Sequence, residues 1–235
     1  MPLSYPYYFL KKTIHTTGLL LAISEKFTDK DYDNWEYDVF HKFDNQIYRD
    51  ILLKQVPLSE TLKIEVIKFS IITFTASVER YLKEIIILSL QRSSSLRKKS
   101  FEKISLNALK LEKFEDINLI KKSLFDEVVN THCKGELFSE KFNKVESFLK
   151  GKKSNTSDLL TAIDKIWGIR NDIAHSNKKD FDYEIKYKGN TIEISNFPNL
   201  EANVALFKLM TDVMIFLEKW EYDVLLKWKV DDFIE

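Results

Sequence analysis

The chain has few of the residues that break helices or cross-link a fold. Its 235 residues include five Gly, four Pro and one Cys. Because Cys133 is the single cysteine, an intrachain disulfide is excluded. Cys133 and its neighbour His132 have no second Cys/His pair at metal-ligand spacing, which argues against a structural zinc site. Three prolines, Pro2, Pro6 and Pro57, lie in the first quarter, so long uninterrupted helices are allowed elsewhere.

The sequence also lacks an excess of charge of either sign and a long apolar run. Lys plus Arg and Asp plus Glu number 36 each, so any contact with a nucleic acid must come from a local basic patch rather than from the net charge. The apolar run from Gly18 to Ile23 is too short to span a bilayer, and no small-residue cleavage pattern follows it. We therefore expect a cytoplasmic protein that makes no membrane contact.

Hydrophobic residues are plentiful enough for a substantial core. They make up 44% of the chain and include 17 Phe and 10 Tyr. We find no repeat period, low-complexity tract or clear linker. The sequence therefore predicts one domain over 1–235, with its core at about 59–220 and an N-terminal helical elaboration at 1–57.

Apolar residues at three- and four-residue spacing predict a mainly α-helical fold. The pattern indicates helices from about 33 to 57, 59–90, 116–130, 136–149, from Thr156 or Ser157 to His175, and after Pro198. The helix at 59–90 should be mostly buried. Its stripe comprises Ile67, Ile71, Phe74, Val78, Leu82 and Ile85, and is widened by Phe69, Ile72, Ile86 and Ile87.

Two further segments break the helical pattern. Residues 91–100 are polar and basic and are interpreted as a loop, for which a solvated connector is favoured over a phosphate-contacting loop. Apolar and charged residues alternate from Tyr183 to Ile194 around a possible tight turn at Gly189-Asn190, which predicts a β-hairpin near 183–195.

The end of the helix that stops at His175 carries side chains suited to RNA chemistry. An imidazole that titrates near neutrality can take or give the proton of a 2′-hydroxyl, so His175 is the candidate acid/base. The guanidinium of Arg170 suits phosphate oxygens that gain charge in the transition state. Asn171 lies four residues before His175, on the same helix face, and can position either the ring or a phosphate.

Helical geometry separates two of these side chains. Arg170 and His175 are five residues apart, which on a regular helix turns them about 140° away from each other. Either the helix loosens after Ala174, or a second subunit supplies the complementary groups. A two-fold dimer would bring one His175 from each chain to the same phosphate, one as base and one as acid.

One segment resembles the signature of the HEPN superfamily: Ile169-Arg170-Asn171-Asp172-Ile173-Ala174-His175. In that signature an Arg is followed by a polar residue, and four to six residues separate the Arg from a His. Here four residues intervene. The stretch from Ala76 to Glu84 is similar to the long helix that precedes the signature helix in many HEPN proteins. The resemblance covers about 59–176, roughly half the chain.

The resemblance implies a HEPN-like helical bundle that dimerises and forms one composite, metal-independent ribonuclease site without a cofactor. Many members of the superfamily are toxins or antiviral effectors, whereas others only bind. We therefore expect an endoribonuclease that acts on RNA as a homodimer, with an antitoxin or defence-system protein as a further partner. The alternatives are an inactive module that binds RNA or a protein, and a structural dimerisation domain for a neighbouring enzyme.

Three residues outside the signature are candidates for supporting parts. Glu79 could pair with a site cation such as Arg170 or with Lys83 on its own helix, and the two pairings carry equal weight. Lys178 and Lys179 follow the signature directly and are the first candidates for RNA contact. No set of ligands for a metal is found.

Overall fold

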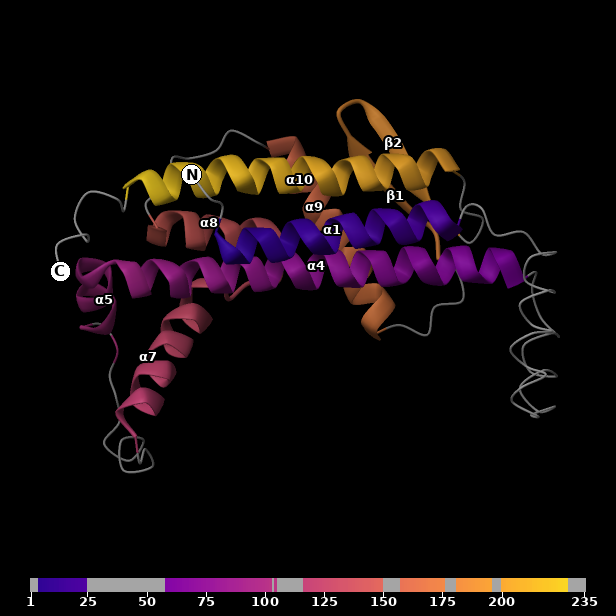
Figure 1. Ribbon diagram of the computed structural model, residues 1–235. Coiled ribbons are helices and arrows are strands. Elements are labelled where there is room, and N and C mark those ends of the chain that lie inside the picture. Colours follow the sequence, from indigo (N-terminus) through magenta and orange to yellow (C-terminus); the bar gives the residue numbers. More distant parts are fainter. Residues whose placement is uncertain are drawn as a thin grey trace, which may run out of the picture. The chain divides into compact units, whose positions relative to one another are not determined.

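The computed structural model describes residues 4–24, 58–102, 104, 116–149, 157–175, 181–195 and 200–227. These residues form seven α-helices and a two-stranded antiparallel sheet (Figure 1), so the predicted mainly α-helical fold with one small hairpin is confirmed. In chain order the elements are α1 (Tyr5–Ser24), α4 (Leu58–Arg92), α5 (Ser94–Phe101), α7 (Ile117–His132), α8 (Phe138–Leu149), α9 (Ser157–His175), β1 (Tyr183–Tyr187), β2 (Asn190–Ile194) and α10 (Leu200–Lys227). The helix expected at about 33–57 lies outside the described residues.

The long helix α4 has the predicted buried stripe, but it is narrower than expected. All six stripe residues are at most 1% exposed, and Ile86 is also buried. Phe69 and Ile72 are 55% and 39% exposed, so the prediction that they widen the stripe is wrong. At 100° per residue, both lie at least about 100° from the stripe axis, which places them on the opposite side of the helix.

The prediction of a loop at 91–100 is wrong, because most of this segment is helix α5. Ser93 has an extended backbone, and its hydroxyl accepts a hydrogen bond from the backbone N–H of Leu96, which caps the new helix. Leu96 is buried and anchors the helix. Arg97 donates to the carbonyls of Leu90 and Gln91 at 3.1 and 2.9 Å, which satisfies groups at the end of α4.

The predicted hairpin is present, with its turn one residue earlier than expected. Tyr183 pairs with Ile194 and Tyr187 with Asn190, so the turn residues are Lys188 and Gly189. Both have positive φ, 49° and 75°, as a tight turn between antiparallel strands requires.

The chain divides into two compact units, and each of the helices α1, α4, α9 and α10 has residues in both. The first unit comprises 1–11, 76–164 and 213–235. Its described core includes Phe142, whose ring lies 5.2 Å from both Phe216 and Trp220. Buried polar bonds connect its helices, because Glu221 accepts from the hydroxyl of Tyr81 at 2.9 Å and from the backbone N–H of Ser4 at 3.0 Å.

The second unit comprises 12–75 and 165–212 and contains the hairpin. Helices α1 and α10 approach closely at Gly18, where an added Cβ would overlap the ring of Phe207. The cation of Lys68 lies 5.4 Å from the centre of the Phe181 ring, just before β1. Within the described ranges, no helix is both long and apolar enough to cross a membrane.

Candidate functional site

Helix α9 places the signature segment at its C-terminal end. The apolar face of the helix is buried through Ile166, Trp167 and Ile169, each at most 4% exposed. The helix remains regular to His175, its last residue. The packing of this buried face holds α9 in place. The final turns of the helix carry polar side chains that solvent can reach.

Arg170 and Asn171 contact each other directly. The guanidinium Nη1 of Arg170 donates to the Asn171 side-chain oxygen over 2.9 Å, and both residues are half-buried. An Arg side chain has five N–H donors, so most of the fork is left for another acceptor. Within the described ranges, no acceptor pairs with the Asn171 amide nitrogen. Among the residues that the structure describes, no carboxylate pairs with Arg170.

His175 is exposed at the end of α9. Because the helix does not loosen before this residue, the five-residue spacing turns its side chain about 140° from that of Arg170. The same spacing rule puts Asn171 and His175 about 40° apart. One copy of the helix therefore presents Asn171 and His175 on one face and Arg170 in another direction, with Asn171 linked to Arg170 by its side-chain hydrogen bond.

A hydrogen bond from the hairpin holds the signature segment, and the sequence did not reveal it. The hydroxyl of Tyr183 in β1 donates to the Asp172 carboxylate at 3.1 Å. Partial burial raises the pKa of Tyr183, and the neighbouring Asp172 charge raises it further. Tyr183 was visible only as an alternating strand residue, and nothing local indicates that it reaches back 11 residues.

A second polar cluster fixes the hairpin to α10. Asp212 accepts hydrogen bonds from the hydroxyl of Tyr187 at 3.0 Å and from the ammonium of Lys188 at 2.8 Å. Partial burial raises the pKa of Asp212, but the bonds from Lys188 and Tyr187 outweigh this and lower it overall. The hairpin that contacts the signature segment is therefore held at its turn as well.

Glu79 forms ion pairs with two lysines. Its carboxylate lies 3.0 Å from Nζ of Lys141 in α8 and 3.5 Å from Nζ of Lys83. The pairing with Lys83, one of the two alternatives raised by the sequence, is present, and Lys141 is a partner that the sequence did not suggest. Burial raises the pKa of Glu79, yet the two lysines, with Lys141 dominant, lower it below 4.5.

The two lysines expected to touch RNA, Lys178 and Lys179, lie outside the described residues. The described residues contain no group of three or more His, Cys, Asp or Glu side chains placed to hold a metal ion. Cys133 is buried at the end of α7, where desolvation raises the pKa of its thiol to about 11.

Comparison with known proteins identifies a family. The model of the family described as RiboL-PSP-HEPN matches residues 34–197, which is more than half of the chain and includes α4, α9 and the hairpin. Searches of curated proteins and of solved structures found no match. Because the family model matches more than half of the chain, the chain belongs to the RiboL-PSP-HEPN family of the HEPN superfamily.

Proposed function

We propose that this HEPN domain is a metal-independent endoribonuclease that cleaves RNA at a site shared by two copies of the chain. The observation that carries the proposal is the end of α9, where Arg170 has no described carboxylate partner and His175 is exposed. A guanidinium is suited to binding the phosphate of a phosphodiester, and an imidazole is suited to proton transfer there.

The proposed reaction needs no group beyond the protein and the RNA. One His175 accepts the proton of the ribose 2′-hydroxyl while O2′ attacks the adjacent phosphorus. The bond from phosphorus to O5′ breaks, and the second His175 donates a proton to O5′. The products are a 2′,3′-cyclic phosphate and a 5′-hydroxyl. Arg170 binds the phosphate oxygens as they gain negative charge, and Asn171 positions Arg170 through the 2.9 Å hydrogen bond.

Two copies are invoked because one regular helix separates the two side chains by about 140°. A two-fold dimer can place the Arg170 and His175 residues of both chains around one phosphate. Glu79 is bound to Lys141 and Lys83, so any support that it gives to the site is positional. Lys178 and Lys179 remain the proposed RNA contacts. The biological setting that we propose is a toxin or antiviral effector controlled by a partner protein.

The same angular separation favours one second candidate, a HEPN module that binds RNA or a protein without cutting. Arg170 and Asn171 together present several donors to an anion even if no His175 reaches the bound group. Such a module would retain RNA in a salt-dependent manner, and replacement of His175 would leave that retention unchanged.

Cleavage of mixed RNA by the purified full chain tests the proposal. His175→Ala should lower the cleavage rate by about 10²- to 10⁴-fold, because it removes the acid/base. His15→Ala is the matched control, since His15 is exposed on α1 and should cut at the parental rate. Circular dichroism should show equal helix content in all three proteins.

Two chemical arms complete this experiment. A substrate with deoxyribose at the scissile position should survive, because it lacks the attacking hydroxyl, and a chelator should leave the rate unchanged. Parental cleavage by His175→Ala would refute the assignment of the acid/base. Cleavage that stops with chelator would show a metal nuclease instead.

A further inference from the structure

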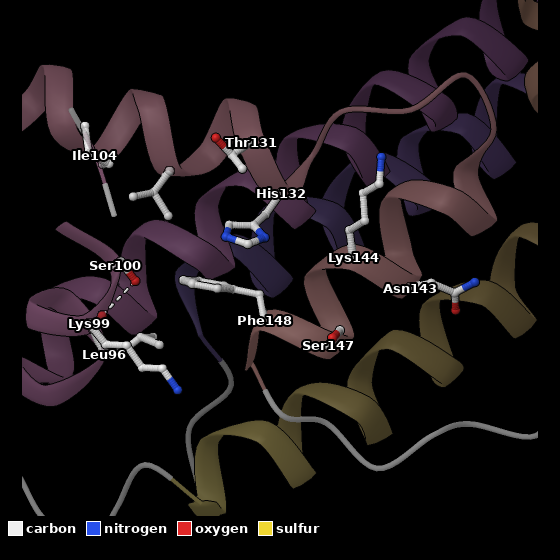
Figure 2. A pocket seen from close by; sticks show the side chains of 11 residues that line it. Leu96, Lys99, Ser100, Ile104, Thr131, His132, Asn143, Lys144, Ser147 and Phe148 are labelled. Atoms are coloured by element: carbon white, nitrogen blue, oxygen red, sulfur yellow. Dashed lines mark hydrogen bonds between the residues drawn. The ribbon is translucent and has the colours of Figure 1, made fainter. Parts of the chain in front are cut away.

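A cavity of about 680 Å³ lies within the first compact unit and uses none of the signature residues. Most of its lining comes from α5, α7 and α8 (Figure 2). Pockets that enclose most of a bound group commonly have volumes of roughly 300–1,000 Å³. The cavity is therefore large enough to receive side chains of a docked peptide segment.

The middle of the cavity wall is an aromatic pair. The ring of His132 from α7 stacks on that of Phe148 from α8, with centroids 4.0 Å apart and an angle of 24° between the planes (Figure 2). Leu96 and Val128, both buried, add apolar surface. Aromatic and branched aliphatic side chains pack favourably against such a wall. This part of the cavity is therefore suited to an apolar side chain.

Two lysines flank the aromatic pair. Lys99 of α5 and Lys144 of α8 both line the cavity, and Figure 2 shows their side chains pointing apart on opposite sides of the pair. The ammonium of Lys144 donates to the backbone carbonyl of Lys134 at 2.6 Å, a neutral acceptor that leaves its charge in place. Because the two cations do not converge, they complement a ligand with negative charges on both sides of an apolar part.

The sequence that follows α10 has this order of charges. Helix α10 ends at Lys227, and the chain continues, outside the described residues, as Trp228-Lys229-Val230-Asp231-Asp232-Phe233-Ile234-Glu235. Carboxylates stand on both sides of the Phe233-Ile234 pair, and they outnumber the one lysine of the segment. The segment 228–235 thus matches the wall of the cavity in both its apolar and its charged parts.

The segment begins close enough to reach the cavity. Helix α10 contacts α4 where the hydroxyl of Tyr81 donates to Glu221, and it ends on the side of the first unit where α5 begins (Figure 1). It also packs on α8, since the rings of Phe142 and Trp220 are 5.2 Å apart. A helix is about 10–12 Å across, whereas residues 228–235 span roughly 26 Å when extended. The segment can therefore pass around α8.

We propose that residues 228–235 dock into this cavity of their own chain, with Phe233 and Ile234 against the aromatic pair and the flanking carboxylates near the two lysines. The docked segment connects the end of α10 to α5 and α7. Neither Arg170 nor His175 lines the cavity, so the docking does not depend on the proposed cleavage site.

Fluorescence anisotropy with a labelled peptide of sequence 228–235 tests this inference. In the full chain, Phe233→Asp removes the apolar anchor of the chain's own segment and leaves the cavity open to the peptide. This variant should bind the peptide saturably, and more weakly as salt rises. The wild-type chain should bind it on the order of tenfold more weakly, because its own segment competes at a high effective concentration.

Charge variants in the Phe233→Asp chain locate the bound peptide. Lys99→Gln and Lys144→Gln should each weaken peptide binding roughly two- to fivefold, the range for a partly exposed ion pair. Lys98→Gln is the matched control, because it removes the same charge from α5 but does not line the cavity. Equal effects of Lys99→Gln and Lys98→Gln would show that the peptide binds elsewhere.

Phe148→Leu in the Phe233→Asp chain tests the aromatic wall and should also weaken the peptide, with thermal unfolding as the check that the domain still folds. Equal affinity of the wild-type and Phe233→Asp chains for the peptide would overturn the proposal. Absence of saturable binding at millimolar peptide and low salt would overturn it as well.

A photoreactive benzoylphenylalanine in place of Phe233 distinguishes docking within one chain from docking on a second copy. After irradiation, mass spectrometry should map the cross-link to the cavity wall, and denaturing electrophoresis should show the mass of one chain. A product with the mass of two chains would assign the cavity to the segment of a second copy and contradict the proposal. The same cross-link should form in the His175→Ala chain, so failure here is distinguishable from failure of the cleavage site.

Discussion

At the scale of single residues, the ion pair between Glu79 and Lys141 has the clearest energetic consequence. The side chains are 23% and 11% exposed, so a lone charge at either position is poorly hydrated. Removal of one member of such a pair takes away an opposite charge that compensates the other. The pair connects α4 with α8 inside the first unit, and its loss should therefore reduce the stability of the fold.

We predict that Glu79→Gln lowers the free energy of unfolding by about 1–3 kcal/mol near neutral pH, the range for a partly buried, hydrogen-bonded charge. The pKa of Glu79 in the folded protein lies below 4.5. The carboxylate therefore stabilises the fold fully above pH 4.5, and this stabilisation is lost as the pH falls through the folded-state pKa of Glu79. Urea unfolding of wild type and Glu79→Gln from neutral to acidic pH measures the stabilisation. The difference in unfolding free energy between the two proteins should shrink in acid.

Glu84→Gln on the same helix is the control. Glu84 pairs with Arg80, whose side chain is 54% exposed, and exposed pairs contribute little to stability. A difference between wild type and Glu79→Gln that grows toward acidic pH would contradict the account.

The residues of the candidate site were predictable one by one, but their contacts were not. The types and spacing of Arg170 and His175 are visible in the sequence because the chemistry depends on them. The bond from Tyr183 to Asp172 depends on where a hairpin folds back against a helix. The partner of Glu79 on α8 is 62 residues away in the chain, so local spacing could indicate only Lys83.

At the scale of secondary-structure elements, two glycines inside helices have opposite surroundings. Gly168 in α9 is exposed, and a Cβ added there would meet nothing within 4 Å. Gly18 in α1 faces the Phe207 ring so closely that a Cβ would overlap it.

We predict that Gly168→Ala raises the free energy of unfolding by about 0.5–1 kcal/mol, since alanine loses less backbone entropy in a helix. Gly18→Ala should lower it by about 1–3 kcal/mol, because the overlap outweighs the same gain. Chemical denaturation of the two variants measures the contrast. Equal stabilisation by both would show that α1 and α10 are not in close contact at this point.

Elements governed by their own periodicity were predictable, and elements governed by caps were less so. The burial of one side of α4 was predictable because six large apolar residues share that face of the helix. Helix α5 was missed because its basic, serine-rich composition is typical of loops, although Ser93 caps it and Leu96 anchors it. The hairpin turn shifted by one residue, because Lys188 adopts the positive φ expected at Gly189 and Asn190.

At the scale of the whole molecule, the central claim concerns two copies of the chain rather than one. The family match and the regular α9 together support a site that a single helix does not complete. The prediction of a single domain over 1–235 stays a prediction. What a second copy would add is a second Arg170 and a second His175 at the same phosphate.

Mixed dimers with one altered chain test this claim most directly. Wild type and His175→Ala are produced together with different tags, and dimers that contain one chain of each are purified and mixed with RNA. Because the shared site needs one His175 as base and the other as acid, the mixed dimer should cut far more slowly than half of the wild-type rate, close to the rate of the His175→Ala dimer. Half of the wild-type rate in the mixed dimer, or full cleavage by a monomeric wild-type chain, would contradict the shared site.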